Sequence, residues 1–176
     1  ITNAIFDGTD AIMLSGESAN GKYPLEAALT MAKIAIEAES NINFGDALIK
    51  KLYEPLENIS DAISLATCTT ADKLNVSAIL TATQSGHTAR MVSKYRPRCP
   101  VIAVTPSKQV ARGLSINFGV QSILSIKLTS TDELMVDAVE KSLAAGYIKK
   151  GDVVIIAAGI PVGEPGTTNM MKIQQV

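Results

Sequence analysis

Tryptophan is absent from this 176-residue sequence, histidine occurs once and cysteine occurs twice. A single histidine, His87, cannot make a metal site, and no Ser–His–Asp or Cys–His pairing is readable. Cys68 and Cys99 fit neither a disulfide framework nor a metal-ligand pattern, so both are predicted to be reduced. The neighbouring Arg98 would favour the thiolate of Cys99, but no role is assigned to this thiol.

An excess of charge is also lacking, because 16 Lys and Arg residues stand against 17 Asp and Glu residues. Neither nucleic acid nor a membrane surface is therefore expected as a partner, and any anion site must be local. No apolar run approaches the roughly 18 residues that span a bilayer, and the first residues do not resemble a signal peptide. We expect a cytoplasmic protein. A hydrophobic content of 47% is enough for a sizeable core.

The most informative stretch is residues 77–105, which predicts a strand–helix–strand unit. Residues 77–80 and 101–104 are typical of buried strands, and residues 88–95 between them have helical spacing. The turn before this helix, residues 83–88, is rich in hydroxyl groups and contains a glycine. A helix N-terminus offers free N–H groups and a partial positive charge, so the turn suits a phosphate. From the residues alone, Thr83 or Ser85 could equally be a simple helix cap.

The remaining elements also alternate between strands and helices. We expect helices at residues 24–41, 60–74, 108–113 and about 131–145, and strands at residues 11–14, 120–124, 153–157 and 170–176. This order predicts an α/β fold, a three-layer sandwich with a mostly parallel sheet. The last strand follows a Gly/Pro-rich loop without an intervening helix, so it should be antiparallel.

One motif is misleading. Gly16, Gly21 and Lys22 match the first seven positions of a P-loop, between a predicted strand and a helix. The eighth position is Tyr23, which cannot supply the Ser/Thr hydroxyl that binds magnesium, and Pro24 removes an N–H group. A P-loop nucleotide hydrolase is therefore rejected.

Three separated segments, spread along essentially the whole chain, resemble the pyruvate kinase family. They are IMLSGESANGKYPLEA, TATQSGHTARMVSKYRPRCPVIAVT and KKGDVVIIAAGIPVGEPGTTNMMKI. The resemblance implies that residues 1–44 are the last strand and helix of a (β/α)8 barrel. Residues 45–57 would be a connector and residues 58–176 a C-terminal allosteric domain.

The resemblance also implies an effector site for one phosphate and the loop that closes over it. Its residues would be Thr83, Gln84, Ser85, Gly86, His87 and Thr88, with Gly163, Glu164, Gly166, Thr167 and Thr168. Two positions depart from the family pattern: His87 replaces a common arginine or lysine, and Leu134 replaces an arginine that holds a second phosphate. AMP or ribose 5-phosphate is therefore expected in preference to fructose 1,6-bisphosphate, with affinity weakening as the pH rises through neutral.

The parent enzyme would transfer a phosphoryl group from phosphoenolpyruvate to ADP, as a homotetramer using Mg²⁺ and K⁺. By resemblance, the residues for this chemistry precede residue 1, so no catalytic or metal-binding residue is assigned and this chain is expected to be inactive. The alternative is a freestanding module that binds a sugar phosphate or nucleotide. Residues 1–44 argue against it, because a lone barrel strand and helix would lack partners. Residues 1–20 are accordingly expected to be disordered, remodelled or packed against another copy.

Overall fold

The computed structural model describes residues 1–127, 130–162, 164 and 166–176. The chain divides into two compact units, Ile1–Asn43 and Phe44–Val176. The first unit contains α1 (Thr2–Phe6), α2 (Gly16–Ala19) and α3 (Pro24–Ser40), with α1 and α2 packed against α3. Pro24 occupies the first helical position of α3, where its missing N–H group costs nothing.

The strand predicted at residues 11–14 is wrong. These residues have irregular backbone, and residues 1–43, all of which are described, contain no strand. A parallel strand is stable only when neighbouring strands accept and donate its backbone hydrogen bonds, and this unit has none to offer. Met13, which would point into the core of a barrel or its helical layer, is 87% exposed.

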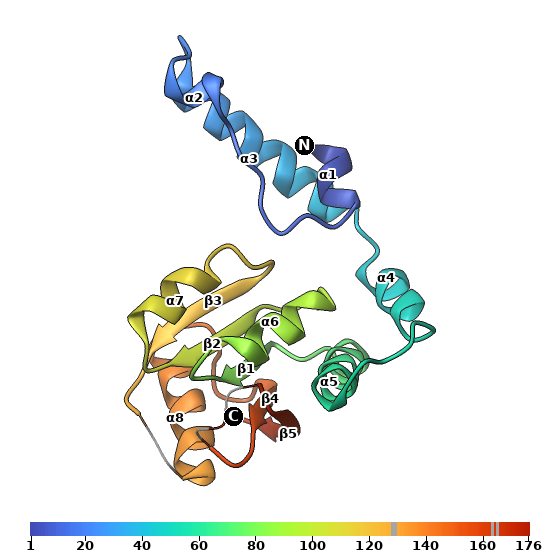
Figure 1. Ribbon diagram of the computed structural model, residues 1–176, viewed down its shortest axis with the longest axis vertical. Coiled ribbons are helices and arrows are strands. Elements are labelled where there is room, and N and C mark those ends of the chain that lie inside the picture. Colours follow the sequence, from blue (N-terminus) through green and yellow to red (C-terminus); the bar gives the residue numbers. More distant parts are fainter. Residues whose placement is uncertain (128–129, 163, 165) are drawn as a thin grey trace. The chain divides into compact units, whose positions relative to one another are not determined.

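The second unit is an α/β sandwich (Figure 1). Its elements are α4 (Phe44–Lys51), α5 (Ile59–Leu74), β1 (Ala78–Ala82), α6 (His87–Lys94), β2 (Val101–Thr105), α7 (Lys108–Leu114), β3 (Val120–Leu124), α8 (Thr131–Ala144), β4 (Val153–Gly159) and β5 (Thr168–Gln175). The strand order is β3-β2-β1-β4-β5. β1 pairs in parallel with both β2 and β4, whereas β5 runs antiparallel to β4. Both the parallel sheet and the antiparallel last strand are as predicted.

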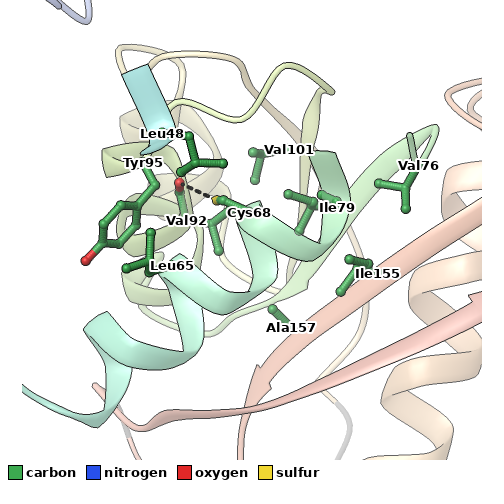
Figure 2. Packing of buried hydrophobic residues seen from close by; sticks show 11 residues of the cluster. Leu48, Leu65, Cys68, Val76, Ile79, Val92, Tyr95, Val101, Ile155 and Ala157 are labelled. Atoms are coloured by element: carbon green, nitrogen blue, oxygen red, sulfur yellow. Dashed lines mark hydrogen bonds between the residues drawn. The ribbon is translucent and has the colours of Figure 1, made fainter. Parts of the chain in front are cut away.

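Helices cover both faces of this sheet. Figure 2 shows the face on which α5 and α6 pack, with Ile79, Val101 and Ile155 of the sheet pointing toward them. The alternate residues, such as Leu80 and Ile156, point to the opposite face and pack with α8. Leu48 of α4 also joins the α5–α6 core, so the segment expected to be a connector contributes to packing in this unit.

A buried carboxylate connects the start of α5 to the end of α6. Asp61 is 2% exposed and accepts hydrogen bonds from Lys94 Nζ and Tyr95 Oη, each at 2.8 Å. The Lys94 hydrogen bond is the main reason that the pKa of Asp61 lies below its usual value. These hydrogen bonds therefore fix the start of α5 against the C-terminal end of α6.

Candidate functional site

A cleft opens where the backbone leaves the carboxyl ends of β1 and β4. These strands are adjacent and parallel, so the turn after β1 and the loop after β4 emerge at the same edge of the sheet. The cleft has a volume of about 640 Å³, including space open to solvent. Of the predicted site residues, it is lined by Thr83, Gln84, Ser85, His87, Thr88, Glu164, Gly166 and Thr167.

Within the turn, the hydroxyl groups cap backbone amides. The N–H of Gly86 donates to Thr83 Oγ1 at 2.9 Å, and the N–H of His87 donates to Ser85 Oγ at 3.4 Å. The capping alternative is met only in part: the N-cap is Gly86, which has no side-chain hydrogen bond, while Thr83 and Ser85 accept from the N–H groups of Gly86 and His87. These bonds do not exclude phosphate binding, because the contact at 3.4 Å is long and weak, and a phosphate oxygen could replace the Ser85 oxygen at little cost.

Gly86 forms the N-cap of α6 in a left-handed conformation, with φ of +80°. A Cβ atom there would lie 2.7 Å from Arg90 Nη1, 3.1 Å from Val110 and 3.2 Å from Leu114. Arg90 lies so close because its Nη2 donates to the carbonyl of Ser85 at 3.0 Å. Glycine therefore suits the backbone conformation, and a larger residue would displace the Arg90 guanidinium and crowd Val110 and Leu114.

Thr88 and Thr168 join the first turn of α6 to the start of β5. Their hydroxyl oxygens are 2.8 Å apart and both side chains are buried. Thr168, like Gly86, lies behind the lining of the cleft. The predicted site residues therefore fall into those that line the cleft and two, Gly86 and Thr168, that support the lining from behind. Gly163 lies outside the described residues.

The loop between β4 and β5 is fixed at its base by Asn169. Its Oδ1 accepts from the N–H of Ile160 at 2.9 Å, and its Nδ2 donates to the carbonyl of Ile160 at 2.6 Å. Farther along, Ser60 Oγ of α5 donates to the carbonyl of Gly166 at 3.2 Å. Sequence reasoning missed Ser60 because no local pattern links residues that are 106 positions apart in the chain. It missed Asn169, nine positions from Ile160, because the path of the loop between them cannot be read from its composition.

His87 lines the cleft. Its Nε2 is buried and has no hydrogen-bond partner among the described residues. Burial, and secondarily the charge of Arg90, lowers the pKa of His87 below its ordinary value of 6.5. In the free chain His87 therefore becomes protonated at a more acidic pH than the sequence analysis expected. Any gain in anion affinity from this protonation occurs in that more acidic range.

The far side of the cleft is formed by the end of β3 and the start of α8. Leu134 lines it, so the position where the resemblance implied an arginine in bisphosphate-activated enzymes presents an apolar side chain here. Asp137 also lines it and accepts a hydrogen bond from Ser125 Oγ. Sequence reasoning missed Asp137 because, on a helix with several acidic residues, spacing alone does not distinguish it from an exposed one.

Both cysteines are free, as predicted. The expected acidification of Cys99 is wrong, since burial raises its pKa to about 11. Among the described residues, no three His, Cys, Asp or Glu side chains are grouped so that they could hold a metal ion. In the same part of the chain, the helices all fall short of the length and apolar character needed to cross a membrane.

Two family models match the chain. The model described as "Pyruvate kinase, alpha/beta domain" matches residues 61–174, and "Pyruvate kinase, barrel domain" matches residues 1–28. A pyruvate kinase from Clostridium acetobutylicum is 61% identical over all 176 residues, which cover 37% of that relative. One from Geobacillus stearothermophilus is 46% identical over the whole chain, which covers 30% of it.

A solved pyruvate kinase structure also matches this chain. The crystal structure of a pyruvate kinase from Cryptosporidium parvum superimposes with a TM-score of 0.85 and 32% identity, covering 99% of this chain and 34% of that one. The chain thus spans about a third of the length of the relatives that it matches.

Proposed function

Because this chain belongs to the pyruvate kinase family of glycolytic transferases, we propose that its cleft is the allosteric site of such an enzyme and binds a phosphorylated effector. The observation that carries this proposal is that the turn at residues 83–88 and three residues of the β4–β5 loop, Glu164, Gly166 and Thr167, line one cleft. The two segments are far apart in sequence, and the family resemblance assigned both to the effector site.

In the proposed complex, the phosphate lies at the first turn of α6. Ser85 and Thr88 hydroxyls donate to it, and the backbone N–H groups and partial positive charge of the helix end stabilise it. Glu164, Gly166 and Thr167 line the same cleft and contact the rest of the effector. With His87 neutral and Leu134 apolar, one phosphate is favoured over two, so AMP or ribose 5-phosphate is preferred to fructose 1,6-bisphosphate.

The domain assignment is part of the same proposal. Residues 1–44 correspond to the last strand and helix of the catalytic barrel, residues 45–57 connect, and residues 58–176 are the regulatory domain. The parent enzyme, a cytoplasmic homotetramer, transfers a phosphoryl group from phosphoenolpyruvate to ADP with Mg²⁺ and K⁺ bound by other barrel residues. On this proposal, the 176-residue chain alone produces no pyruvate from these substrates.

Calorimetric titration of the 176-residue chain with AMP, ribose 5-phosphate and fructose 1,6-bisphosphate tests the effector site. We expect one of the two monophosphates to bind most tightly and Ser85→Ala with Thr88→Ala to abolish its binding. The matched control is Ser115→Ala, which removes an exposed hydroxyl that donates to Arg112 in α7, away from the cleft. Binding of no phosphorylated ligand, or equal binding by the double variant and the control, would contradict the proposal.

A further inference from the structure

Asp137 brings a carboxylate into the same cleft as the phosphate-binding turn. It lies in the second turn of α8, on the side of the cleft formed by Ser125 and Leu134. One carboxylate oxygen, Oδ2, accepts from Ser125 Oγ, which follows β3. A carboxylate has about four acceptor positions, so Asp137 keeps acceptor capacity beyond this bond.

The charges in the cleft are unusual for an anion site. Among the described residues that line it, two carry carboxylates, Asp137 and Glu164, and no lysine or arginine is present. Among these described lining residues the one basic side chain is His87, the first residue of α6. The α6 end of the cleft thus suits an anion, whereas the α8 end suits a group that donates hydrogen bonds.

We propose that Asp137 determines ligand choice: its carboxylate accepts hydrogen bonds from the sugar hydroxyl groups of a monophosphate and repels a second phosphate. This inference rests on the proposed function, in that the phosphate itself is held at α6. The hydroxyl-bearing end of the ligand then reaches Asp137, and its carbon skeleton lies beside Val104, Pro106 and Ile126. Ser125 holds the carboxylate in place and so acts as a positioning residue.

The test compares ligands that differ at the end facing Asp137. The full 176-residue chain and its Asp137→Asn variant are titrated with inorganic phosphate, ribose 5-phosphate and fructose 1,6-bisphosphate. Asparagine keeps the shape and an acceptor for Ser125 but loses the charge. We expect the affinity for ribose 5-phosphate, relative to inorganic phosphate, to fall about tenfold. The relative affinity for fructose 1,6-bisphosphate should rise by a similar factor.

Glu140→Gln is the matched control, because it removes the same charge from an exposed residue one turn along α8. Asp137→Glu keeps the charge and should keep the discrimination against the bisphosphate. Thermal melts of all variants establish that they are folded. If Asp137→Asn changes the ligand ratios no more than Glu140→Gln does, the inference is overturned.

The two proposals fail differently. If phosphate binding requires Ser85 but the ligand preference does not change in Asp137→Asn, only the proposed role of Asp137 is overturned. Absence of binding by any phosphate ligand to the unmodified chain overturns the proposed function and this inference together.

Discussion

The hydroxyl oxygens of Thr88 and Thr168 lie 2.8 Å apart, although 80 positions separate the two residues in the chain. Thr88 is 5% exposed and Thr168 is 1% exposed, so water does not replace this contact easily. It fixes the first turn of α6, where we place the phosphate, against β5, the strand that follows the β4–β5 loop. The pair therefore contributes to stability and, on the proposed function, also to binding.

Thr168→Val should lower the free energy of unfolding by about 1–2 kcal/mol, because it leaves the buried Thr88 hydroxyl without a partner. It should also weaken phosphate binding, since Thr88 loses its fixed orientation. The control is Thr69→Val in α5, whose hydroxyl donates to the Leu65 carbonyl within the same helix at 2.8 Å. Urea unfolding of both variants and phosphate titration measure these effects; equal losses for the two would refute the special role of the Thr88–Thr168 contact.

Gly86→Ala should destabilise the chain more than Gly146→Ala. Both glycines have positive φ, +80° and +75°, so alanine at either position has a conformational cost of about 1–2 kcal/mol. Only at Gly86 does the new Cβ also overlap Arg90 and crowd Val110 and Leu114. We expect an additional loss of about 1 kcal/mol or more from this crowding, measured by denaturant unfolding. Indistinguishable midpoints and slopes would show that the crowding relaxes freely.

Asp61→Asn should lower the free energy of unfolding by about 1.5–3 kcal/mol, the range for hydrogen bonds to a charged group. Lys94 keeps 48% of its side chain exposed, which reduces the loss, because water solvates the ammonium group left behind. As a control, Glu54→Gln breaks the exposed Lys51–Glu54 ion pair and should change the stability by less than about 0.5 kcal/mol. A loss at Asp61 no larger than that at Glu54 would show that the buried carboxylate is not a stabilising tie.

Asp61 also predicts how stability depends on pH. Its pKa is lower in the folded chain than its ordinary value of 3.8, so the unfolded chain binds the proton more readily. The stabilisation is therefore complete above about pH 5 and is lost as the pH falls through 3.8 toward the folded pKa. The difference in unfolding free energy between the parent chain and Asp61→Asn should shrink over this acidic range. A difference that stays constant from pH 6 to pH 3 would contradict the assignment.

His87→Arg should strengthen phosphate binding at pH 8 by about tenfold, because arginine is always charged and the histidine is neutral there. The advantage should shrink as the pH falls through the lowered pKa of His87, since protonation then gives His87 a charge as well. Phosphate itself titrates near pH 6, but it does so equally for both proteins, so the ratio of their dissociation constants isolates His87. A ratio that stays constant while NMR shows His87 becoming protonated would mean that His87 does not contact the phosphate.

Much of the second unit could be predicted from local sequence. Its parallel strands are continuous apolar runs bounded by turns, as in β1 and β4, and the glycine and hydroxyls of residues 83–88 indicate a ligand turn without reference to distant residues. Local sequence pattern failed where the structure or role of a segment depends on another segment that packs or pairs with it. Residues 11–14 have the composition of a strand but no neighbouring strand to pair with, and Asp61 reads as an ordinary first-turn acid until Lys94, 33 positions later, is placed beside it.

The two hydrogen bonds between Asn169 and Ile160 tie together the two ends of the loop between β4 and β5. The two strands pair from Val153 opposite Gln175 to Gly159 opposite Thr168, with one register shift between Ala158 and Gly159. On the proposed function, this pairing is the fixed frame from which Glu164, Gly166 and Thr167 reach the effector. Substitutions at those three positions should therefore change ligand preference while the two strands keep their pairing.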